Sequence, residues 1–208
     1  MSSDWYGNPV LDTWAETSTR MVENAIAANK AAVSAWSVPQ TPDENGVGSV
    51  ETPPIDRIEP AKDLPEWHVE MSAEDREELT VGDRFEFTKT ITEADVTSFA
   101  ASSGDTNPLH LDDEYAQKTR FKGRIAHGTL VGGLISAALA RVPGLVIYLS
   151  QDLEFHNPVR IDDRITADCE IVEDLGNDQY RLRTQVLNGE DTAIDGEAVI
   201  LVDKAPEE

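Results

Sequence analysis

Residues 128–142, GTLVGGLISAALARV, form a helical pattern that is apolar around nearly its whole circumference. A helix on a protein surface keeps one polar face, so a helix of this kind must be covered on every side. Its longest apolar run, Thr129 to Ala140, is too short to span a membrane. The segment therefore predicts a soluble domain in which other elements surround a buried central helix.

Four strand-like segments follow this helix and can supply the cover. They are rich in Val, Ile and Tyr with partial alternation, and they span residues 145–155, 164–172, 179–187 and 193–202. Gly176-Asn177-Asp178 and Asn188-Gly189 predict tight hairpins between them. A strand at 84–91 and a short helix that opens with the capping pattern Thr92 to Asp95 precede the central helix. This order predicts an α+β domain in which an antiparallel sheet wraps around a long central helix.

The chain before this domain divides into two parts. Residues 1–36 include an amphipathic helical pattern from Thr13 to Trp36, which opens with a capping box and carries two tryptophans on its apolar stripe. Residues 37–66 hold six of the eleven prolines and show no periodicity, so they predict an extended, acidic linker. We assign residues 67–208 to the folded domain. The apolar stripe of the first segment needs a cover, either its own domain or a partner surface.

Acidic residues dominate the charge of the chain. Its 40 Asp and Glu residues against 17 Lys and Arg give a net charge of −23, and only six of the bases are lysine. Such a surface suits a protein that works in concentrated salt, although ordinary acidity is the alternative. The same charge argues against nucleic-acid binding, which needs basic patches. The N-terminus has no signal-peptide pattern and the single cysteine, Cys169, is expected to be a small buried residue, so a cytoplasmic location is expected.

The stretch SGDTNPLH at residues 103–110 places reactive side chains around a tight bend. Asp105, Asn107 and Pro108 all suit turns, so one interpretation is purely structural and makes His110 an ordinary loop residue. The other interpretation is that the Asp105 carboxylate and the His110 imidazole face a common substrate, as an acid–base pair requires. These residues alone leave both interpretations open.

Two further features could complete a site. Gly128 begins the central helix, where free backbone N–H groups can bind an anion or polarise a carbonyl, with close packing as the structural alternative. Four basic residues within seven positions predict either a contact with an anion such as a coenzyme phosphate or a solvated loop: Lys118, Arg120, Lys122 and Arg124. His110, His127 and His156 show none of the usual metal-ligand spacings, so no metal site is expected.

Three stretches together resemble the MaoC-like dehydratase family, and in particular its short (R)-specific enoyl-CoA hydratases. They are FAASSGDTNPLH at 99–110, RIAHGTLVGGL at 124–134 and VIYLSQDLEFHNPVRIDDRITADCEI at 146–171. The similarity covers Leu79 to Val202, about 60% of the chain, and the D-x-N-P-x-H core is specific when A-H-G follows it at this distance. The resemblance implies a hot-dog fold, normally paired into a homodimer.

The resemblance also implies an activity, the addition of water to trans-2-enoyl-CoA to give (R)-3-hydroxyacyl-CoA, together with the reverse dehydration. Asp105 and His110 would bind the water between them and share the proton transfers. Asn107 would orient this pair through hydrogen bonds, and the Gly128 N–H would stabilise the enolate oxygen. These three roles match what hydration of a conjugated thioester requires.

The remaining candidates are assigned to substrate binding by the same resemblance. Pro108 and His127 lie next to the predicted catalytic residues, and the basic residues within 118–124 would meet the phosphates of coenzyme A. No separate cofactor is expected, because coenzyme A arrives as part of the enoyl-CoA substrate.

Two alternatives remain for the function. Hot-dog acyl-CoA thioesterases commonly carry a carboxylate on the central helix, and residues 129–140 contain none. A non-catalytic docking protein is the other alternative, because residues 13–36 weakly resemble the phasin helices that coat polyester granules. A combined interpretation is a hydratase held at a storage granule, where it would supply polyhydroxyalkanoate synthesis.

Overall fold

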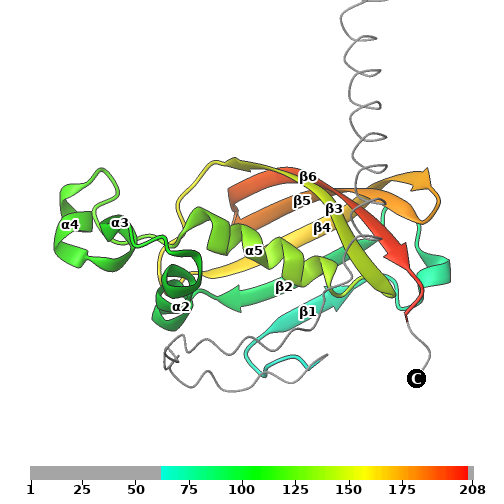
Figure 1. Cartoon of the computed structure of the whole chain (residues 1–208), viewed down its shortest axis with the longest axis horizontal. Coiled ribbons are helices and arrows are strands. Elements are labelled where there is room, and N and C mark those ends of the chain that lie inside the picture. The colour runs from blue at the N-terminus through cyan, green and yellow to red at the C-terminus, as the bar shows by residue number, and fades with distance from the viewer. Residues whose placement is uncertain (1–61, 206–208) are drawn as a thin grey trace, which may run out of the picture. The chain divides into compact units, whose positions relative to one another are not determined.

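A computed structural model describes residues 62–205 of the chain (Figure 1). The predicted N-terminal helix, and the predicted linker as far as residue 61, lie outside the described residues. The elements in chain order are β1 (His68–Met71), the 3-10 turn η1 (Arg76–Glu78), β2 (Arg84–Thr90), α2 (Glu93–Ser103), α3 (Pro108–Leu111), α4 (Asp113–Lys118), α5 (Gly128–Leu139), β3 (Leu145–Phe155), β4 (Arg164–Gly176), β5 (Gln179–Asn188) and β6 (Asp191–Asp203).

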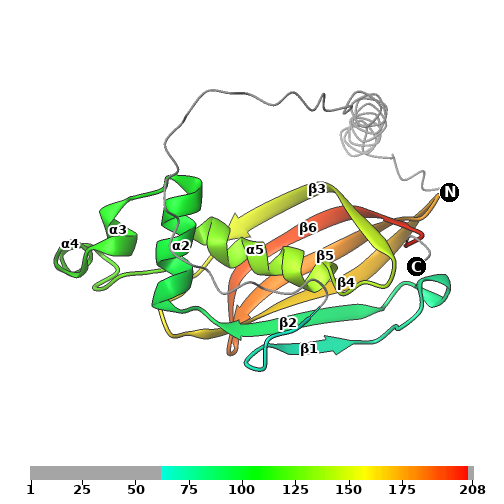
Figure 2. The same ribbon diagram turned by 60° about the horizontal axis from the view of Figure 1, so that its bottom comes forward.

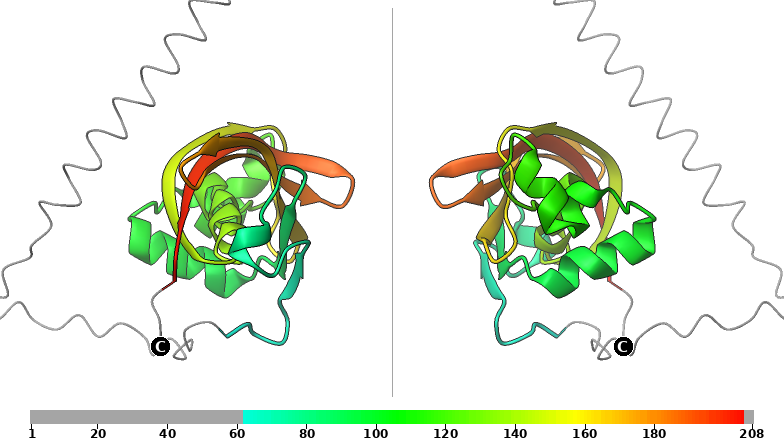
Figure 3. Two further views of the ribbon diagram at one scale, coloured as in Figure 1. Left: turned by 90° about the vertical axis from the view of Figure 1, so that its right-hand side faces the viewer. Right: turned by 90° about the vertical axis from the view of Figure 1, so that its left-hand side faces the viewer.

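One six-stranded antiparallel sheet curls around α5, as the apolar helix predicted (Figures 2 and 3). The strand order is β1-β2-β4-β5-β6-β3. The side chains of α5 that enter the core are Val131, Leu134, Ile135, Ala138 and Leu139. The small helices α2, α3 and α4 gather at one end of the sheet (Figures 1 and 2). This is the hot-dog fold, and the predicted fold class is confirmed.

The predicted strands and hairpins agree closely with the structure. β3 has the predicted bounds, while β4 continues four residues beyond the predicted end through two irregularities in its pairing with β5. Asn177 and Asp178 both have positive φ, 54° and 62°, and Gly189 has φ 62°, as tight hairpin turns require. Cys169 is fully buried in β4, and burial raises the pKa of its thiol, so it is the small core residue that was expected.

The strand β1 was not predicted, and it belongs to a segment that packs on the domain. The ring of Trp67 meets that of Phe87 edge-on, with centroids 5.2 Å apart. Arg141 lies over the Phe87 ring, forms an ion pair with Asp63 and donates to the Ala137 carbonyl at 2.9 Å. The folded domain therefore begins before the predicted boundary at residue 67, because the last residues of the predicted linker contact it.

The predicted capping box opens α2. Thr92 and Asp95 exchange their side-chain and backbone hydrogen bonds, and Lys89 lies 2.6 Å from the Asp95 carboxylate. Burial alone would raise the pKa of Asp95, but the hydrogen bonds from Lys89 and Thr92 outweigh it and the net pKa is lowered. Ionised Asp95 therefore stabilises the fold above the carboxyl's unfolded pKa, and this stabilisation is lost as the pH falls through the lower folded value.

Among the described residues, no helix is long and apolar enough to cross a membrane.

Candidate active site

The loop after α2 holds its shape through the turn residues that the sequence singled out. The Asn107 N–H donates to the Asp105 carboxylate at 3.2 Å, and the Asn107 side-chain oxygen accepts from the Leu109 N–H at 3.0 Å. Asn107 thus caps the short helix α3, and Pro108 occupies its first turn, where a missing N–H does no harm. The turn residues therefore fix the bend, and the helix that follows them, α3, carries His110.

His110 is buried and held in one tautomer. Its Nδ1 lies 2.8 Å from the carbonyl oxygen of Ile125. A carbonyl can only accept a hydrogen bond, so Nδ1 carries the hydrogen and Nε2 keeps a free lone pair. The carbonyl itself is well fixed, because Ile125 bridges to Arg160 and the neighbouring Ala126 N–H donates to the Val159 carbonyl at 2.8 Å.

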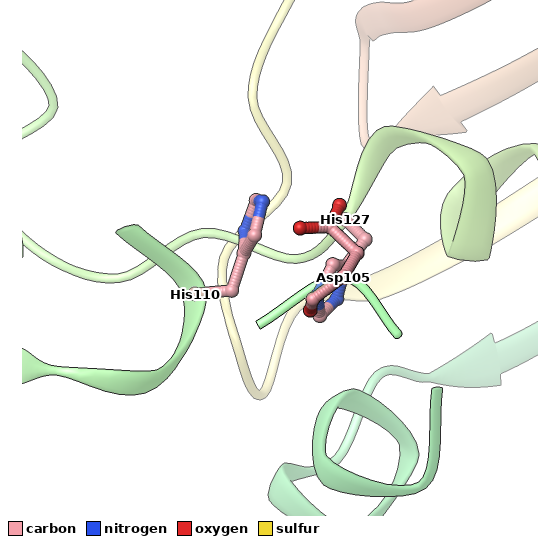
Figure 4. Close-up of side chains that lie close together, drawn as sticks. All are labelled: Asp105, His110 and His127. Atoms are coloured by element: carbon pink, nitrogen blue, oxygen red, sulfur yellow. The ribbon is translucent and has the colours of Figure 1, made fainter. Parts of the chain in front are cut away.

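His127 lies against both members of the predicted pair. Its Nε2 donates to the backbone carbonyl of Asp105 at 3.0 Å, and its ring stacks on His110 with centroids 3.9 Å apart. One side-chain ligand atom from each of Asp105, His110 and His127 lies within 4.8 Å of the others (Figure 4). His127 is only 1% exposed, so the substrate contact predicted for it has no accessible surface. Its ring lies instead against the His110 ring and the Asp105 backbone.

The same three residues raise the question of a metal ion, because their ligand atoms are close to one another. The two imidazole rings, however, are tilted by only 32° at a centroid distance of 3.9 Å. Each ring already uses one nitrogen in a hydrogen bond with a backbone carbonyl, His110 with that of Ile125 and His127 with that of Asp105. One nitrogen of each ring and the Asp105 carboxylate are left for other partners, which is also the arrangement that proton transfer requires.

Gly128 is the first residue of α5 and lies at the wall of a cavity of about 290 Å³. The first intrahelical bond is donated by the Val131 N–H to the His127 carbonyl, so the N–H groups before it are available to a ligand. A Cβ added to Gly128 would lie 2.8 Å from the Phe155 ring, so only glycine fits here without a shift. The cavity is lined by His110, Arg120, Phe121, Ile125, Ala126, Gly128, Val131, Phe155, His156, Asn157, Pro158, Val159 and Ile194.

The four basic residues of the predicted anion site fall into two groups. Arg124 is occupied, because its guanidinium makes two hydrogen bonds with Glu93 and one with Asp113, at 2.7 to 2.9 Å. Hydrogen bonds with Glu93 first, and then Asp113, raise the pKa of Arg124. Two carboxylates already neutralise Arg124, so it is less suited to a phosphate than the other three bases.

The other three bases are exposed and remain available. Lys118 ends α4, and Arg120 and Lys122 lie in the loop that follows. None of the three forms an ion pair within residues 62–205. Arg120 lies over the Phe121 ring and lines the cavity, so it is the base nearest to a ligand held there.

The sequence of the domain is similar to that of known proteins. Residues 77–194 match the model of the MaoC like domain. The chain belongs to this family. The MaoC-like domain is 41% identical over 140 residues to an (R)-specific enoyl-CoA hydratase of Rhodospirillum rubrum, covering 64% of this chain and 97% of that protein. It is also 41% identical to a 3-hydroxybutyryl-CoA dehydratase of Methylorubrum extorquens, over 63% of this chain and 85% of the relative.

Solved structures of similar proteins support the same assignment. An unliganded R-hydratase from Pseudomonas aeruginosa is 46% identical to the MaoC-like domain, with a TM-score of 0.59 over 62% of this chain and 86% of that one. An (R)-hydratase from Aeromonas caviae, described as involved in PHA biosynthesis, is 38% identical with a TM-score of 0.57, over 62% and 98% of the two chains.

Several cavity residues were not among the candidates from the sequence. Phe155 ends β3, His156 and Asn157 follow it, and Ile194 lies on β6. They are separated from the SGDTNPLH loop by about 45 to 90 residues of chain, and nothing in their local pattern indicates a site. Only the resemblance, whose third stretch contains residues 155–157, pointed toward the first three.

Proposed function

We propose that this MaoC-like domain adds water to trans-2-enoyl-CoA to give (R)-3-hydroxyacyl-CoA, and catalyses the reverse dehydration. The observation that carries the proposal is the convergence of the Asp105 carboxylate and the His110 imidazole beside the first turn of α5. Relatives about 40% identical that are named (R)-specific enoyl-CoA hydratase support it.

The hydrogen-bonding capacity of the pair suits one bound water. An ionised Asp105 accepts only, and His110 offers the lone pair of Nε2 because its Nδ1–H is donated to the Ile125 carbonyl. A water that donates one hydrogen to each group points an oxygen lone pair away from both, toward C3 of the substrate. Positioned acid–base groups of this kind contribute about 10²–10⁴-fold in rate.

The proton and electron balance closes within the site. The water oxygen bonds to C3, one water proton passes to the Asp105–His110 pair, and the π electrons move onto the thioester oxygen as an enolate. The Gly128 N–H, at the positive end of α5, donates to that oxygen. The enolate then collapses, C2 takes the proton back from the pair, and both side chains return to their starting forms.

The reaction needs no separate cofactor in this proposal, since coenzyme A is part of the substrate. A cavity of about 290 Å³ holds the reacting end but not the whole thioester, so the nucleotide extends toward solvent. Arg120 stands at the cavity, and Lys118 and Lys122 are exposed nearby in the chain. We assign these three bases to the phosphates.

Arg120→Glu is expected to raise the KM for crotonyl-CoA about tenfold with little change in kcat, because it reverses a charge that meets phosphate. Steady-state kinetics measure the change, and Lys204→Glu at the exposed C-terminal end is the matched control. Crotonyl-pantetheine lacks the phosphates, so its KM should not respond to Arg120→Glu. Equal effects on both substrates would contradict the phosphate contact.

The direct test is incubation of the full chain with crotonyl-CoA at high salt. Loss of the enoyl absorbance, with (R)-3-hydroxybutyryl-CoA as the chiral product, supports the proposal. Release of free thiol without hydration would indicate the thioesterase, although α5 carries no acidic residue. Absence of both reactions would favour the docking protein.

We further propose that two copies pair through β3, the long edge strand of the sheet. It exposes Leu145, Ile147, Tyr148 and Phe155, which is unusual for an edge that stays in water. Sedimentation equilibrium is expected to give twice the chain mass, and a monomer at micromolar concentration would contradict the pairing.

The storage-granule role stays a proposal for residues 13–36, supported by their amphipathic pattern and by the PHA-related relative. Removal of residues 1–61 is expected to leave kcat unchanged and to abolish binding to polyhydroxyalkanoate granules in a co-sedimentation assay. Removal through Met71 also deletes β1, Trp67 and Asp63, and should lower the free energy of unfolding by about 1–3 kcal/mol. Lost turnover after the shorter removal would instead make the extension part of the catalytic domain.

A further inference from the structure

We propose that His127 is a positioning residue that fixes the relative places of the base, the imidazole and the oxyanion donor. This inference rests on the proposed function. His127 does not line the cavity and is 99% buried, so it does not act by touching the substrate. It contacts instead each part of the site that must keep its place during the reaction.

The first contact holds the Asp105 loop. The His127 Nε2–H donates to the Asp105 backbone carbonyl at 3.0 Å, across 22 positions of the chain. Asp105 itself is exposed on a loop, and its other hydrogen bonds within residues 62–205 are made with Ser103 and Asn107. The bond from His127 is therefore what ties this exposed carboxylate to the buried part of the domain.

The second contact orients the His110 ring. His127 lies between two aromatic rings, with centroids 3.9 Å from His110 and 4.9 Å from Phe99. Phe99 comes from α2, so the helix backs the His127 ring, which in turn backs His110. The ring contact and the hydrogen bond from Nδ1 to the Ile125 carbonyl together fix the orientation of the His110 ring, and so the direction in which its Nε2 points.

The third contact is covalent. His127 is the N-cap residue of α5 and immediately precedes Gly128, the proposed oxyanion donor. The His127 backbone therefore marks the start of α5, and its side chain joins this point to the Asp105 loop and to His110. One side chain thus links all three groups whose mutual distances set the reaction geometry, and a misplacement of about 1 Å in such a geometry costs about 10²-fold in rate.

A nitrogen atom of His127 that has no hydrogen-bond partner favours the positioning role over a role in core packing alone. His127 Nδ1 is buried without any hydrogen-bond partner in residues 62–205, although His127 is the N-cap and its side chain could have capped the helix. A buried acceptor without a partner costs free energy that phenylalanine or leucine would avoid in the same space. The presence of imidazole here is explained by the use of its other nitrogen, the Nε2–H that holds Asp105.

Two substitutions divide the functions of the ring. His127→Phe keeps a ring for the stack and loses the donor, whereas His127→Gln keeps an N–H near the place of Nε2 and loses the ring. Both are expected to lower kcat for crotonyl-CoA hydration by about 10–10²-fold, with KM changed less than threefold. His68→Phe, an exposed histidine on β1, is the matched control and should behave as wild type.

Several outcomes would overturn the proposal. If both variants fold and keep the wild-type kcat, His127 has no positioning role. If KM rises while kcat is unchanged, His127 contributes to substrate binding instead. Nitrogen-15 NMR of the wild-type imidazoles supplies a test that needs neither turnover nor a stable variant. The Nε2–H tautomer is expected for His127, and an Nδ1–H tautomer would contradict the geometry. An inactive wild-type protein that shows the expected tautomer would refute the reaction while leaving the architecture of the site intact.

Discussion

Asp105→Asn is expected to reduce kcat for crotonyl-CoA hydration by about 10²–10⁴-fold, with KM nearly unchanged. Asparagine keeps the size and the oxygen that accepts from the Asn107 N–H, so the loop should keep its shape. Its amide cannot take a proton from water, and its NH₂ group would donate where the carboxylate accepts. The loss should therefore appear in the chemical step, measured as the decay of enoyl absorbance at saturating substrate.

The chain offers a matched control for this substitution. Asp112 is another exposed aspartate of the same region, and it caps α4 by accepting from the Tyr115 N–H. Asparagine caps helices as well as aspartate does, so Asp112→Asn should leave both activity and stability near wild type. An Asp105→Asn protein with kcat within about threefold of wild type would exclude Asp105 as the proton acceptor.

His110→Asn should be equally damaging, for a complementary reason. The asparagine side-chain NH₂ can replace Nδ1 as the donor to the Ile125 carbonyl, so the buried acceptor stays satisfied. The substitution removes Nε2, the atom that faces the bound water. We expect kcat to fall by about 10²–10⁴-fold while the circular dichroism spectrum and the melting temperature stay close to wild type.

The double variant tests whether the two groups act together. Because Asp105 and His110 would share one water, removing both should cost little more than removing either, as for residues that act as a unit. Losses that multiply would show that the two side chains act on separate steps. His68→Asn serves as the control for replacing a histidine elsewhere in the domain.

Sequence patterns predicted those parts of the fold in which burial imposes a clear pattern of apolar residues. The apolar circumference of α5 and the Val- and Ile-rich runs of β3 to β6 are visible without any neighbour, because each must bury most of its surface. β1 escaped prediction since it is four residues long and includes His68 and Glu70. No helix was predicted for α3 or α4, because four and six residues are too few to show a helical period.

The site divides in the same way between local and distant information. The bend at Asn107 and the end of α2 depend on neighbouring residues, so the conformation of the SGDTNPLH loop could be predicted from the sequence. The role proposed for His127 could not be anticipated, because it depends on ring contacts with His110 and Phe99 that only the folded chain creates. Nor could the sequence alone show that Arg124 is paired with carboxylates while Arg120 is not. One of these carboxylates belongs to Glu93, which lies 31 positions away in the chain.

The two borders of the sheet differ in a way that limits growth. β3 is eleven residues long and exposes the apolar side chains of Leu145, Ile147, Tyr148 and Phe155. β1 at the opposite border is four residues long, and its His68 and Glu70 are exposed and polar. A domain with one apolar edge strand can pair symmetrically with one copy of itself, and this pairing buries the edge strand of both copies. Association should then stop at the dimer, because no apolar edge strand stays exposed to which further copies could add and form a fibre.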